Sequence, residues 1–267
     1  MEVKALKFGG LTAKRPIVQG GMGVGVSLSS LAGNVAKCGG VGTISGVHPG
    51  YREADFKENP FRANLRAIGN ELEKAKEIAN GGIIGFNFMT VMNHYEEYVK
   101  EAIAAGADFI VSGAGLPVNL AKYAAGTRAA ILPIVSSARA LKLIVKQWQR
   151  ADRLPDAVVV EGPLAGGHLG YPYGHLVDGT FDTLEDSLVD VVDYVRELEE
   201  KNGVKIPVIA GGGVRNHADM ERLMALGASG VQVGTKFVAT EECDAAPAFK
   251  QAYLRSRKED VQLIESP

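Results

Sequence analysis

The chain has 267 residues, of which 46% are hydrophobic and 22% charged, with a formal net charge of −2. This composition is typical of a globular protein, and without a basic stripe it argues against nucleic-acid binding. No apolar run reaches the roughly 18 residues of a membrane helix and no secretory h-region opens the chain, so we expect a cytoplasmic protein with no membrane partner, whose Cys38 and Cys243 are free thiols.

Eight short apolar runs follow one another, and each precedes a stretch with helical character. The strand-like runs are residues 16–22, 41–46, 83–89, 109–115, 130–137, 157–162, 207–213 and 230–238. The helix-like stretches are residues 27–37, 61–80, 95–106, 117–125, 138–151, 183–203, 217–227 and 246–257. Nearly continuous apolar runs indicate strands buried on both faces, and their alternation with helices indicates a parallel sheet.

Eight such units at this length predict one α/β domain over residues 1–267, closed into a TIM (β/α)8 barrel. An open, doubly wound sheet is the alternative. Two connections are longer than a plain barrel needs, namely residues 47–60 after the second strand and 163–182 after the sixth. Both follow strand carboxyl ends, where barrel enzymes build their active sites. They are either part of a site or decoration of the scaffold.

Glycines gather at the predicted carboxyl ends of the strands. "AGGGV" ends the seventh strand with Gly212 and Gly213, and "QVGT" ends the eighth with Gly234 and Thr235. In barrels the loops after these two strands often hold a phosphate, and glycine frees backbone N–H groups to point at it. Tight turns are the other explanation for these glycines.

One phosphate site suits a mononucleotide cofactor such as FMN, since the chain has no Walker A sequence and no dinucleotide fingerprint. Asn87, at the end of the third strand, carries an amide that can donate to and accept from a flavin edge. No zinc-ligand spacing occurs, so we expect no metal. A barrel without flavin that acts on sugar phosphates is a further alternative, with Lys236 as its nearest candidate amine.

Five motifs in order carry a family resemblance over residues 15–256: "PIVQGGMG", "GFNFM", "VVVEGPLAGGHLG", "PVIAGGGV" and "GVQVGTKFV". Together they resemble the FMN-dependent nitronate monooxygenases, also called 2-nitropropane dioxygenases. They equally resemble the flavin-type enoyl-acyl-carrier-protein reductases of the same superfamily. The resemblance implies an oxidoreductase with a TIM barrel and one FMN at its mouth.

The resemblance also implies roles for individual residues. Contacts to the flavin would come from Gly20, Gly21, Met22, Asn87, Glu161 and Gly166, and contacts to its phosphate from Gly212, Gly213, Gln232, Gly234 and Thr235. His168 would be the catalytic histidine near the reactive face. We expect Gly166 and Gly167 to let the backbone pass close under a flat ring, where a Cβ would collide.

Two reactions remain open. In the first, an alkyl nitronate is oxidised and O2 is the electron acceptor. In the second, NADH is the donor and the substrate is an enoyl thioester on an acyl carrier protein. The nitronate enzymes typically have glutamine where this chain has Glu161, which favours the reductase, whereas the two long connections resemble a group filed with the nitronate enzymes. On those connections we favour nitronate oxidation.

The reductase alternative needs a basic docking patch, for which Lys57, Arg62 and Arg66 are candidates, although a solvated helix face is the better explanation for these three residues. A homodimer is a candidate assembly. The final segment usual in the family after "IESP" is not present in this sequence.

Overall fold

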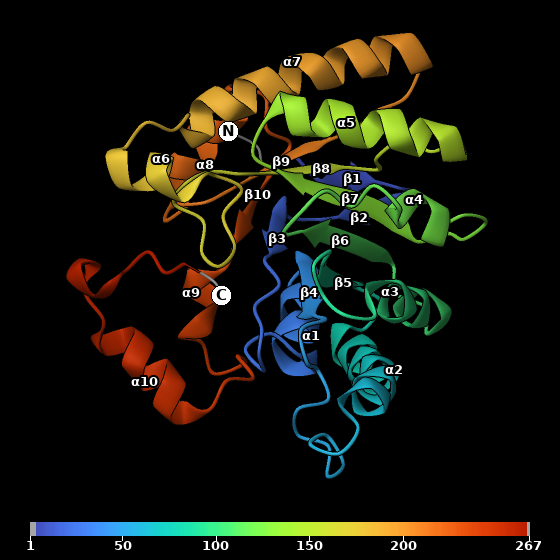
Figure 1. The fold of residues 1–267 in the computed structure, drawn as a ribbon, viewed down its shortest axis with the longest axis vertical. Helices are drawn as coiled ribbons and strands as arrows, with labels where there is room; N and C mark the ends of the chain where they lie inside the picture. The colour runs from blue at the N-terminus through green and yellow to red at the C-terminus, as the bar shows by residue number, and fades with distance from the viewer. Residues whose placement is uncertain (1–3, 266–267) are drawn as a thin grey trace.

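The computed structural model describes residues 4–265, and its centre is a closed barrel of eight parallel strands (Figure 1). In order around the barrel the strands are β3 (Ile17–Gln19), β4 (Val41–Ser45), β5 (Ile83–Met89), β6 (Phe109–Gly113), β7 (Ala130–Val135), β8 (Val158–Glu161), β9 (Val208–Gly211) and β10 (Gly230–Val233). The TIM-barrel prediction is therefore confirmed, and the open-sheet alternative is wrong because β10 pairs with β3.

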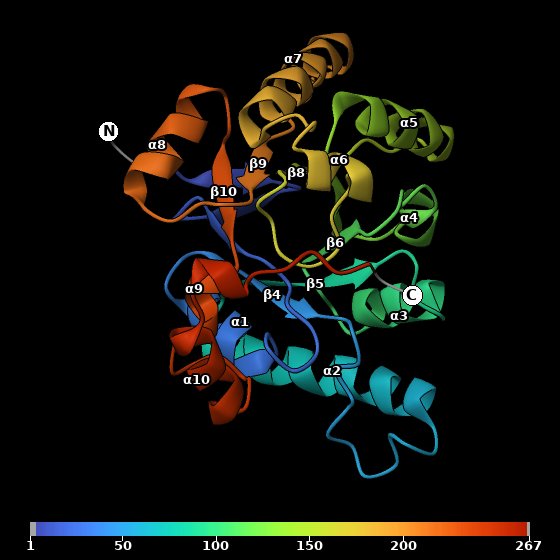
Figure 2. The same ribbon diagram turned by 60° about the vertical axis from the view of Figure 1, so that its left-hand side comes forward.

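Helices surround the barrel and cover the outer faces of the strands (Figures 1 and 2). They are α1 (Ser29–Lys37), α2 (Pro60–Ala79), α3 (Tyr95–Ala104), α4 (Leu120–Tyr123), α5 (Ala138–Trp148), α7 (Leu184–Asn202) and α8 (His217–Ala225), with α9 (Thr235–Val238) and α10 (Pro247–Arg255) after the last strand. The long connections after the second and sixth barrel strands are both present, and the second contains the short helix α6 (Tyr173–Asp178). No helix between residues 4 and 265 has the length and hydropathy that crossing a membrane requires.

The last apolar run, residues 230–238, is not one strand. β10 ends at Val233, and residues 235–238 form the short helix α9. Pairing with β3 and β9 stops at the end of β10, so the chain beyond Gly234 has no neighbouring strand to which it can add. The stretch 117–125 likewise contains only the four-residue helix α4.

Sequence reasoning missed a hairpin before the barrel. β1 (Leu6–Phe8) and β2 (Leu11–Ala13) pair antiparallel around Gly9 and Gly10, whose φ angles of 52° and 79° suit a tight two-residue turn. The side chains of Leu6 and Phe8 are buried against the amino-terminal layer of the barrel interior. There the rings of Phe8 and Phe109 pack edge-to-face, with their centroids 6.0 Å apart. The hairpin thus closes the barrel end opposite the glycine-rich loops.

A carboxylate from the C-terminal region holds α1 in place. The N-terminus of α1 has no side-chain cap of its own, and the backbone N–H groups of Leu28, Ser30 and Leu31 donate to Asp244 at 2.8–3.1 Å. Glu71 of α2 accepts from the Ser29 N–H at 3.0 Å. Free N–H groups at a helix start favour such anions. This contact fixes the segment between α9 and α10 beside α1, as Figure 2 shows.

Gln19 closes the barrel between its first two strands. β3 pairs with β4 only at Val18 and Val41, and beyond that point the strands separate. The buried Gln19 amide fills the gap, because its Nε2 donates to the Thr43 carbonyl at 2.9 Å and its Oε1 accepts from the Thr43 N–H at 3.1 Å. The Gln19 side chain therefore replaces a pair of backbone hydrogen bonds between β3 and β4, so the chain after Gln19 can leave the sheet.

Replacing Gln19 with methionine should lower the free energy of unfolding by about 2 to 4 kcal/mol, because the Thr43 N–H and C=O would be left buried without partners. Urea unfolding of the purified variant measures this change. Gln149→Met, at an exposed turn, is the control and should change stability by about 0.5 kcal/mol or less. Equal losses in the two variants would show that the Gln19 bridge is dispensable.

Candidate active site

The carboxyl ends of the strands bring the glycine-rich loops together at one mouth. Gly21 follows β3, and a Cβ added there would lie 2.3 Å from the Asn87 Cβ. Only glycine lets this backbone approach β5 so closely. Gly20 ties the same loop to the last strand through its N–H, which donates to the Val233 carbonyl at 2.9 Å. The loop of Gly20 and Gly21 therefore meets Asn87 and the last strand at the mouth, and the contacts of these residues with a flavin stay a prediction.

Asn87 offers an amide to the mouth. Its backbone belongs to β5 and pairs with Ser45, while its half-buried side chain makes no hydrogen bond to any of residues 4–265. Met22 lies next to the loop after β10, since a Cβ at Gly234 would be 3.4 Å from the Met22 sulfur. The amide of Asn87, on β5, and the thioether of Met22, beside the loop after β10, thus both border the mouth.

Glu161 ends β8 and forms a pair with Gln232 of β10. The Gln232 Nε2 donates to the Glu161 Oε1 at 2.7 Å, across the position of Gly211. A Cβ at Gly211 would come within 3.3 Å of that nitrogen, so glycine leaves room for the bond. Burial raises the pKa of the Glu161 carboxyl to about 7, and the hydrogen bond from Gln232 opposes the rise.

The loop after β9 has backbone N–H groups with no hydrogen-bond acceptor among residues 4–265. Gly212 and Gly213 have φ angles of 109° and 78°, which favour glycine, so the tight-turn explanation holds for both. Within residues 4–265, the N–H groups of Gly212, Gly213 and Gly234 donate to no other residue. β9 and β10 are neighbours, so these loops, with the exposed Thr235, form one cradle with free donors.

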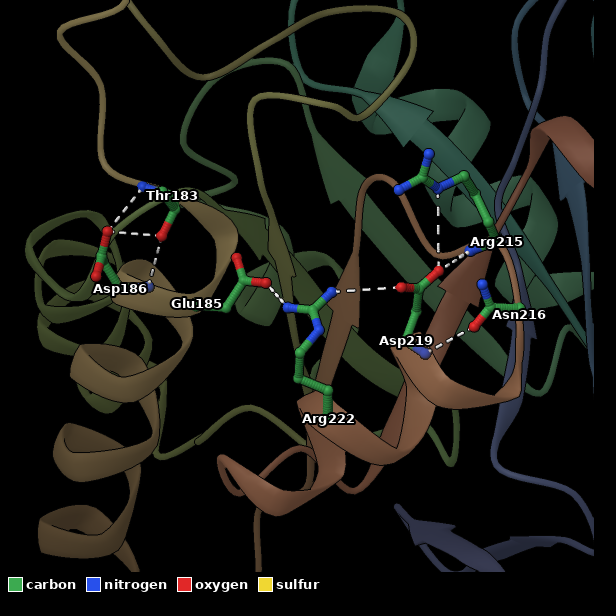
Figure 3. A network of polar contacts seen from close by, with 7 residues as sticks. All are labelled: Thr183, Glu185, Asp186, Arg215, Asn216, Asp219 and Arg222. Carbon is green, nitrogen blue, oxygen red and sulfur yellow. Dashed lines mark hydrogen bonds and ion pairs between the residues drawn. The ribbon is translucent and has the colours of Figure 1, made fainter.

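Figure 3 shows how this loop is held from outside. The Asp219 carboxylate of α8 accepts from the Arg215 N–H at 2.9 Å and pairs with Arg222, which also contacts Glu185 of α7. Asn216 caps α8 by accepting from the Asp219 N–H at 2.9 Å. Sequence reasoning missed this support, although an asparagine three residues before an aspartate at a helix start is a capping signal.

His168 lies in a loop that is pinned at its ends. The Gly162 N–H donates to the Gly211 carbonyl at 3.0 Å, and the Ser136 hydroxyl donates to the Gly170 carbonyl at 2.9 Å. The Tyr171 hydroxyl reaches back to the Glu161 carbonyl at 3.3 Å. Between these anchors the His168 ring is exposed and makes no hydrogen bond to any residue from 4 to 265. Sequence reasoning did not find Ser136 or Tyr171.

Gly166 and Gly167 have open space where a side chain would stand. A Cβ added at either residue meets no atom within 4 Å, so the expected collision concerns a bound ring and stays a prediction. Gly167 has a separate reason to be glycine, because its φ is 82°. Of the other histidines, His175 lies in α6, His217 in α8 and His94 at the start of α3, as expected. His48 differs from the expectation, because it is exposed only three residues after β4, at the carboxyl end of that strand.

Formal charge is scarce at the mouth. Residues 19–28, 44–50, 86–93, 112–119, 134–138, 161–171, 211–214 and 231–235 cover the strand ends and the chain just after them, and Glu161 is their only Asp, Glu, Lys or Arg. No cluster of His, Cys, Asp and Glu able to hold a metal ion occurs within residues 4–265. The mouth therefore combines free donors, one titratable carboxyl and two exposed imidazoles, those of His48 and His168.

Two other places are less suited to be a site. A cavity of about 630 Å³ lies at the amino-terminal end of the barrel, but its Arg153 and Lys205 already pair with Asp156 and Glu199 at 3.1 and 2.6 Å. In the candidate docking patch, Arg66 forms ion pairs with Glu53 and Asp55. The other two residues of this patch, Lys57 and Arg62, are exposed and form no ion pair with any residue from 4 to 265.

Comparison with known proteins places the chain among flavin-type oxidoreductases. Residues 4–267 match the family model described as nitronate monooxygenase. A probable nitronate monooxygenase of Staphylococcus saprophyticus is 25% identical over 98% of this chain and 75% of that protein. FabK from Thermotoga maritima superposes with a TM-score of 0.70 and 26% identity, covering 91% of this chain but only 65% of that structure. A nitroalkane oxidase of Streptomyces ansochromogenes, 23% identical with a TM-score of 0.63 over 89% of this chain and 70% of that one, shares the fold.

The raised pKa of Glu161 predicts pH-dependent stability. Between its ordinary pKa of 4.5 and its folded pKa of about 7, the unfolded chain has lost the proton that the folded chain keeps. The stabilisation from this group is therefore full below pH 4.5 and lost as pH rises to 7, a change of about 3 kcal/mol. Urea unfolding of wild type and Glu161→Gln from pH 4.5 to 8 measures it. Parallel curves for the two proteins would contradict the assignment.

Proposed function

The chain belongs to the nitronate monooxygenase family, and on that premise we propose that it binds one FMN at the barrel mouth and oxidises alkyl nitronates with O2. The observation that carries the cofactor proposal is the cradle after β9 and β10, where the N–H groups of Gly212, Gly213 and Gly234 have no partner within residues 4–265. Free N–H groups on adjacent glycine loops suit a phosphate, and a single such cradle suits FMN rather than FAD.

The remaining residues fit a flat ring beside that phosphate. Gly20 and Gly21 keep side chains out of the space bordered by Asn87, and the free Asn87 amide can bond to either a donor or an acceptor on the ring edge. We assign Glu161 and Gln232 to the part of the mouth that would contact the ring, because their hydrogen bond joins the ends of β8 and β10. Bound there, FMN would supply the electron-transfer chemistry.

In this proposal His168 acts on the substrate. Its loop is pinned by Ser136 and Tyr171 and its imidazole is exposed, which supports a position over the mouth. Protonated, the ring would orient a nitronate anion by donating an N–H; neutral, it could accept the Cα proton of a nitroalkane at a ring nitrogen. The pinned ends limit where the imidazole can go and thus set the geometry of either role.

An NADH-dependent enoyl-acyl-carrier-protein reductase is the second candidate. The observation that favours it is the acidic Glu161, since the nitronate enzymes resembled by this chain typically have glutamine there. Against it, the docking patch is partly neutralised, because Arg66 pairs with Asp55 and Glu53. Nothing favours a sugar-phosphate aldolase or isomerase, as Lys236 is exposed beyond β10.

The cofactor proposal predicts that acid treatment of the purified protein releases one FMN per chain. Gly212→Asp and Gly213→Asp should each lose the flavin, because a carboxylate would stand against the phosphate and neither φ suits a side chain. Gly126→Asp, at a positive-φ position on an outer turn, is the matched control and should stay loaded. Release of FAD, or full FMN loading of both variants, would contradict the phosphate assignment.

The reaction proposal predicts that ethylnitronate bleaches the flavin rapidly under anaerobic stopped-flow conditions, whereas NADH bleaches it slowly. His168→Ala should keep its FMN but lose about 100-fold or more in turnover, the scale of a group that moves or holds a proton in the reaction.

His175→Ala, in exposed α6 of the same long connection, is the control and should lose much less. Rapid bleaching by NADH with little response to the nitronate would favour the reductase instead. Near-normal kcat/KM in His168→Ala would show that the histidine is structural.

A further inference from the structure

Glu161 is an acidic group without a cation to balance it. Its Oε1 accepts from Gln232, and no lysine, arginine or histidine within residues 4–265 forms an ion pair with it. It is also the only formally charged residue among the strand ends of the mouth. A charge placed there acts on a ligand with little competition from other ionisable groups.

The elements packed around Glu161 bring few titratable groups. β7 contributes Ser136, β9 contributes only glycine and Val214, and β10 contributes Gln232. The loop after β8 adds the exposed His168, Tyr171, whose pKa is raised mainly by burial, and Asp182, whose charge also raises the pKa of Tyr171. Three cations follow these strand ends along the chain: Arg139 is exposed at the start of α5, Arg215 is engaged by Asp219, and Lys236 is exposed in α9.

The carboxyl can therefore change charge near neutral pH. Burial raises its pKa to about 7, so the neutral and the anionic forms are both populated under ordinary conditions. In its neutral form Glu161 has the shape and charge of glutamine, the residue usual in the resembled nitronate enzymes. In its anionic form it is the only negatively charged side chain among the strand ends of the mouth.

We propose that Glu161 is a specificity-determining residue: protonated, it admits an anionic substrate to the mouth, and ionised, it excludes one. The inference rests on the proposed binding of a nitronate anion at this mouth. Its physical basis is like-charge repulsion in a partly buried site. For unit charges about 6 to 10 Å apart in an effective dielectric near 20, the repulsion weakens anion binding on the order of 10- to 100-fold.

The test uses butyrate, an unreactive carboxylate with the size and charge of propyl nitronate. Its affinity for the flavin-loaded protein is titrated from pH 5.5 to 8.5 through the visible flavin spectrum, while butyrate itself remains ionised. Wild-type affinity should be high below the Glu161 pKa and fall about 10- to 100-fold as pH rises above it. Glu161→Gln should keep the low-pH affinity throughout.

Two further variants separate Glu161 from its neighbours. Gln232→Met removes the hydrogen bond that lowers the Glu161 pKa, so the fall should move to higher pH, which gives a second readout should Glu161→Gln fold poorly. His168→Gln removes the imidazole that is nearest to Glu161 along the chain and should retain the fall. The same fall in Glu161→Gln, its loss in His168→Gln, or an absence of butyrate binding at every pH would overturn the proposal.

Because butyrate is not turned over, the result separates this inference from the proposed reaction. A protein that discriminates against butyrate at high pH but does not oxidise ethylnitronate keeps the inference and loses the reaction. A protein that oxidises ethylnitronate but binds butyrate equally at every pH loses the inference alone. If the protein carries no flavin, the cofactor proposal fails, and the same titrations are read by saturation-transfer NMR of butyrate.

Discussion

The geometry of the mouth depends on how the first barrel strand leaves the sheet. A parallel strand that continued beyond Gln19 would pair with β4 and keep Gly20 to Met22 within the barrel wall. Instead the Gln19 amide bonds to both backbone groups of Thr43, which completes the hydrogen bonding of β4 while the chain turns away. Buried backbone groups need partners, so this exchange lets the barrel stay closed and still open a loop at its mouth.

That loop in turn sets where the other parts of the site can lie. Gly21 passes so close to Asn87 that no side chain fits between them, and the Gly20 N–H ties the loop to β10. The same close approach of backbones recurs at Gly211, which leaves room for the Glu161–Gln232 bond. At these positions the glycines serve tertiary contacts, whereas Gly212 and Gly213 also serve the local conformation of their turn.

The electrostatics of the mouth also follow from the small number of side chains that its glycine-rich loops carry. Glycines and short apolar residues supply backbone donors but no compensating charge, so the one carboxyl that remains is sensitive to burial. A surface glutamate would keep its ordinary pKa, because water stabilises its charge. Glu161 differs since it ends a buried strand and faces Gln232 rather than a cation. Residue type alone does not reveal this property.

The sequence by itself determined the fold and supplied the candidate residues of the site. Alternation of apolar runs with helical stretches predicts the barrel, because strands buried on both faces must be apolar along their whole length. Motif order placed Gly20, Asn87, Glu161, His168, Gly212 and Thr235 at strand ends, and parallel strands bring such ends to one face. Only the tertiary structure decided the Gln19 bridge, the anchoring of the His168 loop by Ser136, the hairpin beneath the barrel and the pKa of Glu161. The bridge, the loop anchor and the pKa depend on contacts between residues distant along the chain, which neither local periodicity nor composition records. The hairpin pairs locally, but its position beneath the barrel depends on the distant contact of Phe8 with Phe109.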